Sequence, residues 1–378
     1  MNNSLLSQNY ILVIISSTLY YASAYMINAV SSQYSVSLGA TKSVAGVVAA
    51  VFTLASFFVR PFSGWITDRK GRRLVLVRGL LLSLIAGVFL LTGKSVFMLR
   101  LARVIFGAGY SAFTTSAGTM VCDVVPDEKI GVAISVYGVT GVIAGALAPG
   151  LGLWLYSYGF IWVAVVTTSL TALSLLISFF IKYSEKNYTD INKQFRIVEK
   201  TALPRAYTIV FFAMSSAAVN SFVPLMAEER EINTPGVFFA VSSLFMLAVR
   251  FTCTKLISGN HKNKVFYLAD IIYVAGFIIL AFSYSTLWFL VAATLYGIGA
   301  ALIHPIVNTT AVSQCTAENR GLATGTFMMS QDLGMTIGAL LWGAISEKWG
   351  FTAVYLTVSA FLFVMMTVYK SVLSRLTD

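Results

Sequence analysis

Long apolar runs separated by short polar connections constrain this chain more than any other feature. They cover residues 10–32, 42–66, 74–92, 96–121, 131–154, 160–181, 205–226, 236–257, 265–284, 286–313, 321–345 and 352–373. A helix of about 20 apolar residues crosses the hydrocarbon core of a bilayer. Backbone groups in lipid must also be hydrogen-bonded within the spanning element. The runs therefore predict an all-α integral membrane protein with twelve transmembrane helices.

The composition excludes a water-soluble globular protein. Of the 378 residues, 57% are hydrophobic and 11% are charged, whereas soluble domains carry about 25% charged residues. The connections are too short to hold a soluble catalytic domain. Cys122, Cys253 and Cys315 show no paired spacing, so we expect neither a disulfide framework nor a zinc site. No cofactor and no metal are expected.

The distribution of Lys and Arg predicts the orientation in the membrane. With a cytoplasmic N-terminus, most of them fall in inner connections, whereas the outer loops hold only Lys42, Lys94, Arg230 and Lys348. By the positive-inside rule, both termini lie in the cytoplasm. The net charge of +11 then reflects topology and contact with anionic membrane lipid, not nucleic acid. The short loops suggest a bacterial cytoplasmic membrane.

The chain is predicted to be a tandem repeat of two six-helix bundles. Residues 182–204 form the longest polar connection and separate residues 1–181 from residues 205–378. The segment AVFTLASFFVR, which ends at Arg60, matches AVSSLFMLAVR, which ends at Arg250, at an offset of 190. The same offset relates Gly107 to Gly297 and Gly109 to Gly299. Parallel repeats of this kind commonly enclose a substrate site near the bilayer midplane.

The connection between the second and third runs reads GWITDRKGRR, from Gly64 to Arg73. It resembles the signature loop of the major facilitator superfamily, and with twelve runs and a repeat the resemblance extends over the whole chain. The implied conformational-switch residues are Gly64, Asp68, Arg69, Gly71, Arg72 and Arg73.

Each residue of this loop has an expected role. Gly64 should allow two helices to approach closely and Gly71 should permit a sharp turn. The family resemblance implies that Asp68 contacts the start of the eleventh helix, near Arg320 and Gly321, and favours the outward-open state. The alternative is a loop that only fixes topology.

Two further motifs resemble patterns of the same family. Arg103 precedes Gly107 and Gly109 in the pattern Arg-x-x-x-Gly-x-Gly, and we assign it to proton coupling and to the substrate cavity. The alternative is an arginine that extends to the outer interface. The fifth run resembles the helix-packing motif of proton-coupled exporters at Gly145, Pro149 and Gly152, although Ala144, Ala148 and Leu153 depart from it, and packing alone is the other interpretation.

Polar side chains deep in apolar runs complete the candidate site. Asp332 lies eleven residues after Gly321, roughly 16 Å into the membrane. An ionised carboxylate there costs about 2.5–3.5 kcal/mol, so Asp332 should face the interior and exchange protons or form a structural hydrogen bond. His304 is a second proton-coupling candidate or a residue at a helix kink. The substrate cavity is assigned to Tyr21, Tyr25, Asn28, Arg103, His304, Asn308, Gln331 and Asp332.

These features predict a proton-coupled secondary transporter that exports a small organic solute, a drug or a metabolite, by rocking of the two bundles. The alternatives are a metallophore or zwitterionic metabolite exporter, and an uptake symporter or uniporter. An enzyme is not expected, because the sequence contains no HExxH or Walker motif and its only histidines are His261 and His304. The expected partners are a small-molecule substrate, protons and membrane lipid, and we expect the protein to function as a monomer.

The switch interpretation of Asp68 leads to a first prediction. Asp68→Asn should leave folding intact and shift the resting population toward the inward-open state, because the outward-open state loses a carboxylate at a helix N-terminus. A single cysteine in the outer cavity should therefore react more slowly with a membrane-impermeant maleimide. Asp190→Asn in the linker serves as the control. Equal labelling rates in all three proteins would favour the purely topological interpretation.

Overall fold

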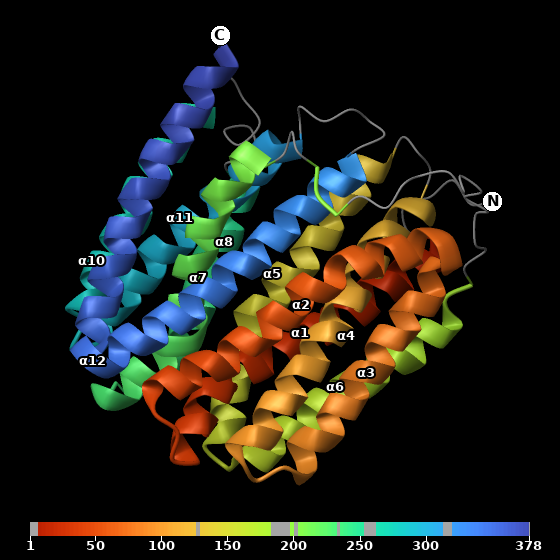
Figure 1. The fold of residues 1–378 in the computed structure, drawn as a ribbon, viewed down its shortest axis with the longest axis horizontal. Coiled ribbons are helices and arrows are strands. Elements are labelled where there is room, and N and C mark those ends of the chain that lie inside the picture. Colours follow the sequence, from red (N-terminus) through yellow and green to blue (C-terminus); the bar gives the residue numbers. More distant parts are fainter. Residues whose placement is uncertain are drawn as a thin grey trace. The chain divides into compact units, whose positions relative to one another are not determined.

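The fold was analysed in a computed structural model, which describes residues 7–125, 129–182, 197–199, 203–232, 235–252, 262–312 and 320–377. For Asp68 and Arg320 it describes the backbone alone. Within these ranges all the regular elements of appreciable length are α-helices (Figure 1). They are α1 (Gln8–Ser37), α2 (Lys42–Lys70), α3 (Arg72–Thr92), α4 (Val96–Asp123), α5 (Ile130–Tyr156), α6 (Phe160–Phe180), α7 (Leu203–Glu229), α8 (Pro235–Thr252), α10 (Lys262–Ala281), α11 (Thr286–Val312) and α12 (Arg320–Thr377).

The helices agree closely with the first ten apolar runs of the sequence. The last two runs, 321–345 and 352–373, both lie in α12, which is interrupted by the non-helical backbone of Gly350 at φ 78° and ψ 176°. Among the described residues, 10 helices are long and apolar enough to cross a membrane, and Pro235–Arg250 is a shorter apolar helix. The all-helical membrane architecture is therefore confirmed, while the separate eleventh and twelfth helices stay a prediction.

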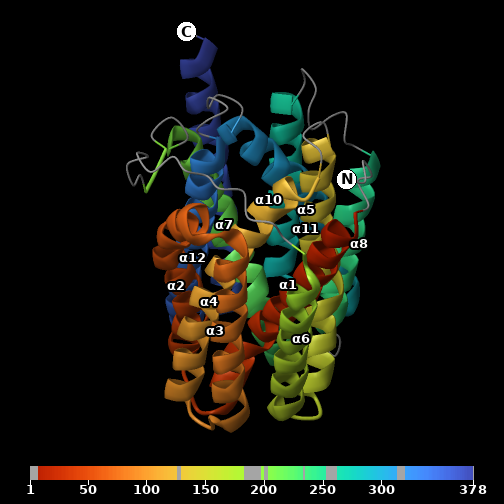
Figure 2. The same ribbon diagram turned by 90° about the vertical axis from the view of Figure 1, so that its right-hand side faces the viewer.

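The chain forms two compact units. One comprises Met1–Asn28 and Val51–Arg196, and the other comprises Ala29–Ala50 and Ile197–Asp378. In the first unit α3 packs along α4 and α6 (Figure 2). In the second unit α7 packs along α12, and α11 packs against α8 and α10. The end of α1 and the start of α2 thus belong to the second unit, whereas the expected division was at the 182–204 linker.

Each unit ties its first helix to its third helix through a buried hydrogen bond. In the first unit the hydroxyls of Tyr20 in α1 and Ser83 in α3 lie 2.5 Å apart. In the second unit the hydroxyls of Ser215 in α7 and Tyr273 in α10 lie 3.0 Å apart. The tyrosine lies on the first helix in one unit and on the third helix in the other, but a tyrosine–serine hydrogen bond joins these two helices in both units.

Two glycines, Gly107 and Gly297, let helices touch at corresponding places in the two units. A Cβ at Gly107 would lie 3.1 Å from Phe52 Cα, and one at Gly297 would lie 3.0 Å from Ser242 Cα. In both cases it would come still closer to the carbonyl oxygen of that residue. Phe52 and Ser242 are themselves 190 positions apart. The paired contacts of α4 with α2 and of α11 with α8 are what a repeat of this length predicts.

These contacts predict that Gly107→Ala and Gly297→Ala destabilise the protein. The added methyl group would overlap backbone atoms, and overpacking typically costs about 1–3 kcal/mol. Gly138→Ala is the matched control, because no atom lies within 4 Å of its added Cβ and alanine gains up to about 1 kcal/mol of helix propensity. Guanidinium titrations in detergent, followed by tryptophan fluorescence, measure the three midpoints. Equal midpoints would contradict the importance of the close contacts.

Candidate functional site

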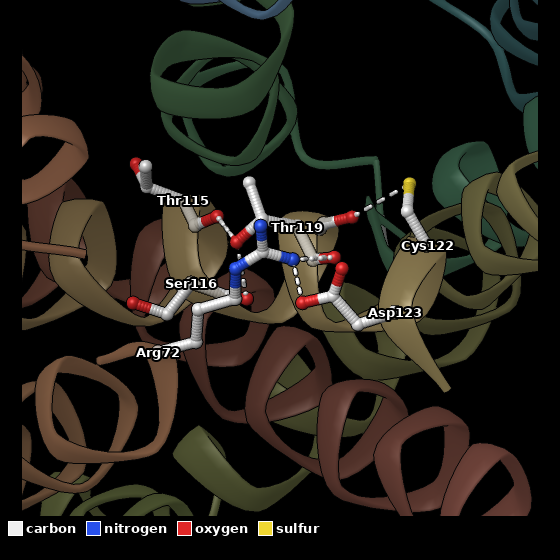
Figure 3. Close-up of polar contacts among 7 residues, drawn as sticks. Arg72, Thr115, Ser116, Thr119, Cys122 and Asp123 are labelled. Atoms are coloured by element: carbon white, nitrogen blue, oxygen red, sulfur yellow. Dashed lines mark hydrogen bonds and ion pairs between the residues drawn. The ribbon is translucent and has the colours of Figure 1, made fainter. Parts of the chain in front are cut away.

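The basic residues that follow Gly71 clamp the start of α3 onto two other helices. Gly71 has φ 99°, which permits the sharp turn expected there. Arg72 forms an ion pair with Asp123 and donates a hydrogen bond of 2.8 Å to the Thr119 carbonyl oxygen at the end of α4 (Figure 3). Arg73 donates a hydrogen bond of 3.1 Å to the Phe179 carbonyl oxygen near the end of α6. Positive charges near the C-termini of α4 and α6 interact favourably with the dipoles of these helices.

The other loop residues contribute less to packing. Arg69 is exposed and lies over the Trp65 ring, 4.6 Å from its centroid. Among the described residues, an added Cβ at Gly64 would meet only Thr115 Cγ2 at 4.0 Å, and the close helix approach expected at Gly64 stays a prediction. The Asp68 side chain lies outside the described residues, and its contact with the start of the eleventh helix stays a prediction.

Two tyrosines from different helices lie near a buried arginine in the first unit, and two more tyrosines contact one of them. The hydroxyls of Tyr21 in α1 and Tyr137 in α5 lie 3.0 Å apart, and the Tyr21 ring also contacts Tyr25 and Tyr110, with centroids 6.2 Å away in each case. Arg60 of α2 is only 5% exposed and interacts electrostatically with both Tyr21 and Tyr137. Two of the predicted cavity residues, Tyr21 and Tyr25, are thus brought together.

Hydroxyl groups complete the surroundings of Arg60. Its guanidinium donates hydrogen bonds of 3.0 Å to Ser56 Oγ and 3.4 Å to Thr114 Oγ1. Ser56 belongs to α2 and Thr114 to α4, so the side chains around Arg60 come from α1, α2, α4 and α5. We call Arg60, Tyr21, Tyr137 and Thr114 the Arg60 cluster.

Arg103 is buried, as an interior position requires. It is 2% exposed, and its guanidinium carbon lies 4.4 Å from the centroid of the Phe52 ring. Phe52 in turn contacts Tyr110, with ring centroids 5.2 Å apart. Such burial disagrees with an arginine that extends to the outer interface. Asn28, another predicted cavity residue of this unit, is half-buried in α1.

The exporter-like motif of α5 packs against α1. A Cβ at Gly152 would lie 2.6 Å from Met26 Cγ and 2.9 Å from the Met26 carbonyl oxygen, so only glycine fits there. A Cβ at Gly145 would be in ordinary contact with the Tyr25 ring at 3.9 Å. Pro149 lies inside the helix and is buried. Gly152 is therefore the residue at which α5 packs closely against α1, whereas Gly145 lies beside the ring of Tyr25.

His304 of the second unit lies among two aromatic rings and two polar side chains. Its ring lies between Phe212, 5.8 Å away, and Phe327, 5.6 Å away, measured between ring centroids. Its imidazole forms a hydrogen bond with Gln331 and interacts electrostatically with Arg250. Two predicted cavity residues, His304 and Gln331, are thus in contact.

The other two candidates of the second unit lie on the same helices. Asp332 is 7% exposed, so it faces the protein interior as expected. Asn308 follows His304 by about one turn of α11, and it is half-buried.

In the second unit, the start of α2 is held against α7 and α12 by an ion pair, a hydrogen bond and a close helix contact. Lys42 pairs with Glu229, and the Ser43 amide donates a hydrogen bond of 2.8 Å to Glu347 Oε2. A Cβ at Gly46 would lie 3.1 Å from Gly343 Cα, so the two helices touch. We call these contacts the α2 latch.

Comparison with known proteins identifies the family. The sequence pattern of the Major Facilitator Superfamily matches residues 13–263 and 208–375. The chain belongs to the Major Facilitator Superfamily. It is a multi-pass membrane transporter and not an enzyme.

Two similar curated proteins of this superfamily are bacterial. The staphylopine export protein of Staphylococcus aureus (strain Mu50 / ATCC 700699) is 24% identical over 359 residues, which is 87% of this chain and 87% of that protein. The multidrug resistance protein MdtG of Salmonella schwarzengrund (strain CVM19633) is 25% identical over 329 residues, covering 82% and 80%. The resemblance to bacterial drug and metabolite exporters is therefore confirmed.

Solved structures share the fold at lower identity. A POT family transporter in complex with a thioalcohol-conjugated peptide aligns with TM-score 0.81 at 13% identity, over 98% of this chain and 96% of that chain. The nucleoside transporter NupG aligns with TM-score 0.76 at 14% identity, over 97% and 99%. The human organic anion transporter MFSD10 aligns with TM-score 0.72 at 15% identity, over 95% and 98%.

The sequence interpretation of this superfamily member missed four residues of the candidate site. Tyr110, Tyr137, Arg60 and Arg250 carry contacts described above, yet none was assigned to the cavity. The sequence could have pointed to the two arginines as candidates, because Arg60 and Arg250 are the last residues of the two matching segments. Thr114 and His304, their neighbours, are also 190 positions apart.

The clamp predicts energetic coupling between Arg72 and Asp123. Their side chains are 12% and 7% exposed, and a hydrogen bond to a charged group contributes about 1.5–3 kcal/mol. Arg72→Ala and Asp123→Asn should each lower the free energy of unfolding by about 2 kcal/mol, and the double variant should lose less than their sum. Lys70→Ala, at an exposed position, is the control. Additive losses would show that the pair does not act as a unit.

Proposed function

We propose that this transporter exports a small organic solute, a drug or a metabolite, in exchange for protons. Two six-helix bundles rock about the site to expose it alternately to either side of the membrane. In this scheme both termini are cytoplasmic, the membrane is the bacterial cytoplasmic membrane, and the working unit is a monomer.

The direction of transport is supported by the relatives. One similar protein is named for staphylopine export and another for multidrug resistance, and both align with more than four-fifths of this chain. Neither of these two relatives is named for uptake.

The observation that carries proton coupling is the burial of Asp332. Asp332 is 7% exposed in an apolar helix, where a carboxylate has to be protonated or paired because an isolated charge there is costly. Proton binding and release at Asp332 would therefore follow the access of water or of a cationic group to it. Arg103 and His304, each among aromatic rings, would tune this exchange.

Alternating access is supported by the arrangement of α1 and α2. Both helices run from residues of one unit into residues of the other. Rocking of the two expected bundles, residues 1–181 and residues 205–378, would therefore have to break the α2 latch or bend these helices. Its ion pair and hydrogen bonds are partly exposed to water, where such contacts contribute only about 0–1 kcal/mol each, so breaking them costs little.

The second candidate function is the export of a more specific class of substrate, a metallophore or another zwitterionic metabolite. Buried groups of both signs, Arg103 and Asp332, favour it. The relative named for the export of one compound, staphylopine, also favours a defined metabolite over many drugs.

Proton release provides the direct test. Energised everted vesicles that contain the transporter are challenged separately with cationic dyes, zwitterionic metabolites and anions. The wild type should release protons with one class of compound. Asp332→Asn and Arg103→Ala should abolish this release, because the variants lack the titrating group or the charge that tunes it.

Asp270→Asn is the matched control, since Asp270 is also a buried carboxylate of the second unit and the proposal gives it no role. It should retain proton release. Release that persists in both Asp332→Asn and Arg103→Ala would refute the coupling assignment. A wild type that is folded but silent across the panel would favour uptake or uniport.

A further inference from the structure

The start of α2 has no negative charge of its own. Its first residue is Lys42, and no acidic residue lies in its first turn. The N-terminus of a helix carries a partial positive charge, and its first N–H groups have no partners within the helix. A lysine at this end adds to the positive charge. The sequence of α2 therefore leaves a helix end that a carboxylate from elsewhere can stabilise.

Glu347 of α12 supplies this carboxylate. Its Oε2 accepts a hydrogen bond of 2.8 Å from the Ser43 amide in the first turn of α2. The carboxylate also forms hydrogen bonds with the hydroxyls of Ser43 and Thr41 and interacts electrostatically with Lys42. Thr41 accepts a hydrogen bond of 3.4 Å from the Val44 amide, as an N-cap residue does. The N-terminus of α2 is thus capped by its own threonine and by a glutamate 304 positions away from Ser43.

A glycine contact brings the two helices close enough for this cap. Gly46 follows Ser43 by three residues, and Gly343 precedes Glu347 by four. A Cβ at Gly343 would lie 3.1 Å from Gly46 Cα and 3.3 Å from Ser43 Cα. The two backbones therefore touch about one turn away from the cap. Moving the start of α2 away from α12 would break the cap and the glycine contact together.

The cap differs from the other polar links of α12 because it is exposed to water. Trp342 of α12 donates a buried hydrogen bond of 2.7 Å to the Met214 carbonyl oxygen of α7, whereas the bond between Ser43 and Glu347 is exposed. Water can replace an exposed hydrogen bond at little cost, but a buried group that loses its partner stays unsatisfied. The start of α2 is therefore easier to release than α7. From Val51 onward α2 belongs to the first unit.

We propose that Glu347 is a positioning residue that keeps the outer end of the transporter closed by capping α2. The inference rests on the proposed function, in which Lys42 and Glu347 lie at the outer surface and the two expected bundles rock. In the attached arrangement the carboxylate stabilises the N-terminus of α2, and after release water takes its place. The negative charge of Glu347 thus sets the ratio of the two arrangements, and the solute leaves when α2 is released.

A distance measurement between two outer turns tests the proposal. After the native cysteines are replaced by serine, spin labels are attached to Ser37→Cys and Ser285→Cys, two exposed positions of the second unit. Double electron–electron resonance on the full chain in nanodiscs gives the populations of a shorter separation, with α2 attached, and a longer one, with α2 released. Glu347→Gln should raise the ratio of released to attached protein about two- to fivefold, as expected for a carboxylate at a helix N-terminus.

Three variants control for other effects of the substitution. Glu347→Asp should retain part of the cap, because the charge stays on a shorter side chain. Glu229→Gln removes the partner of Lys42 without changing a contact to a helix amide. It should alter the ratio less, because the side chains of that ion pair are 31% and 49% exposed and surface pairs contribute little. Glu231→Gln, two residues further along at an exposed position, should leave the ratio unchanged.

A carboxylate built into α2 itself separates capping from a general structural role. Val44 is the third residue after Thr41, so Val44→Glu creates the capping box Thr-x-x-Glu within α2. The helix then no longer depends on Glu347. Val44→Glu should raise the released population, and Glu347→Gln in this background should cause no further increase. Guanidinium midpoints of these variants should match that of the wild type, because no buried contact is lost.

Three results would overturn the proposal. They are an unchanged ratio in Glu347→Gln, an equal rise in Glu231→Gln, and a full additional effect of Glu347→Gln in the Val44→Glu background. If Glu347→Gln alone does not fold, an unchanged ratio in both Glu347→Asp and Val44→Glu would overturn it as well.

The outcome is independent of proton coupling, because the distance measurement uses neither a solute nor a proton gradient. A ratio that depends on Glu347 without proton release in vesicles would contradict proton antiport alone. Proton release with a ratio independent of Glu347 would contradict only the role proposed here.

Discussion

The close approach of α2 and α4 at Gly107 is the contact on which the rest of the first unit depends. Helices in lipid gain no hydrophobic free energy from pairing, so they are held by van der Waals contact and hydrogen bonds. Because a side chain at Gly107 would meet Phe52 backbone atoms, the two helices are fixed in register there. One turn earlier, Arg103 lies over the Phe52 ring. Two turns later, Thr114 meets Arg60. One backbone contact thus positions both buried arginines.

The second unit keeps this framework and changes its chemistry. Gly297 meets Ser242 as Gly107 meets Phe52, so α8 and α11 are held in the same register. Arg250 therefore lies beside residue 304, as Arg60 lies beside residue 114. The residue types differ, however. Thr114 accepts a hydrogen bond from Arg60, whereas His304 lies near Arg250 and forms a hydrogen bond with Gln331. The two arginines, 190 positions apart in the sequence, therefore lie beside different polar groups in the two units.

Long apolar runs made the helices predictable, because a bilayer sets both their length and their composition. The turn at Gly71 and the paired glycines followed from local chemistry and from the repeat. The contacts between side chains were harder to predict from the sequence. The outer face of a membrane bundle is as apolar as its interior, so periodicity does not reveal which face of α2 carries Arg60 inward. The Arg72–Asp123 pair joins residues 51 positions apart, and only the fold brings them together. The last two apolar runs are separated within α12 by the single non-helical residue Gly350.

A transporter that couples two solutes needs one group that senses each of them. A ligand shifts a conformational equilibrium only as far as its affinities for the two states differ. An ionised carboxylate in an apolar helix is costly unless it is paired or protonated. The apolar runs of residues 1–181 contain no Asp or Glu, whereas α10 and α12 of the second unit contain the buried Asp270 and Asp332. The proposed exchange of solute for protons therefore requires its proton-binding group to lie in the second unit, where Asp332 is the candidate.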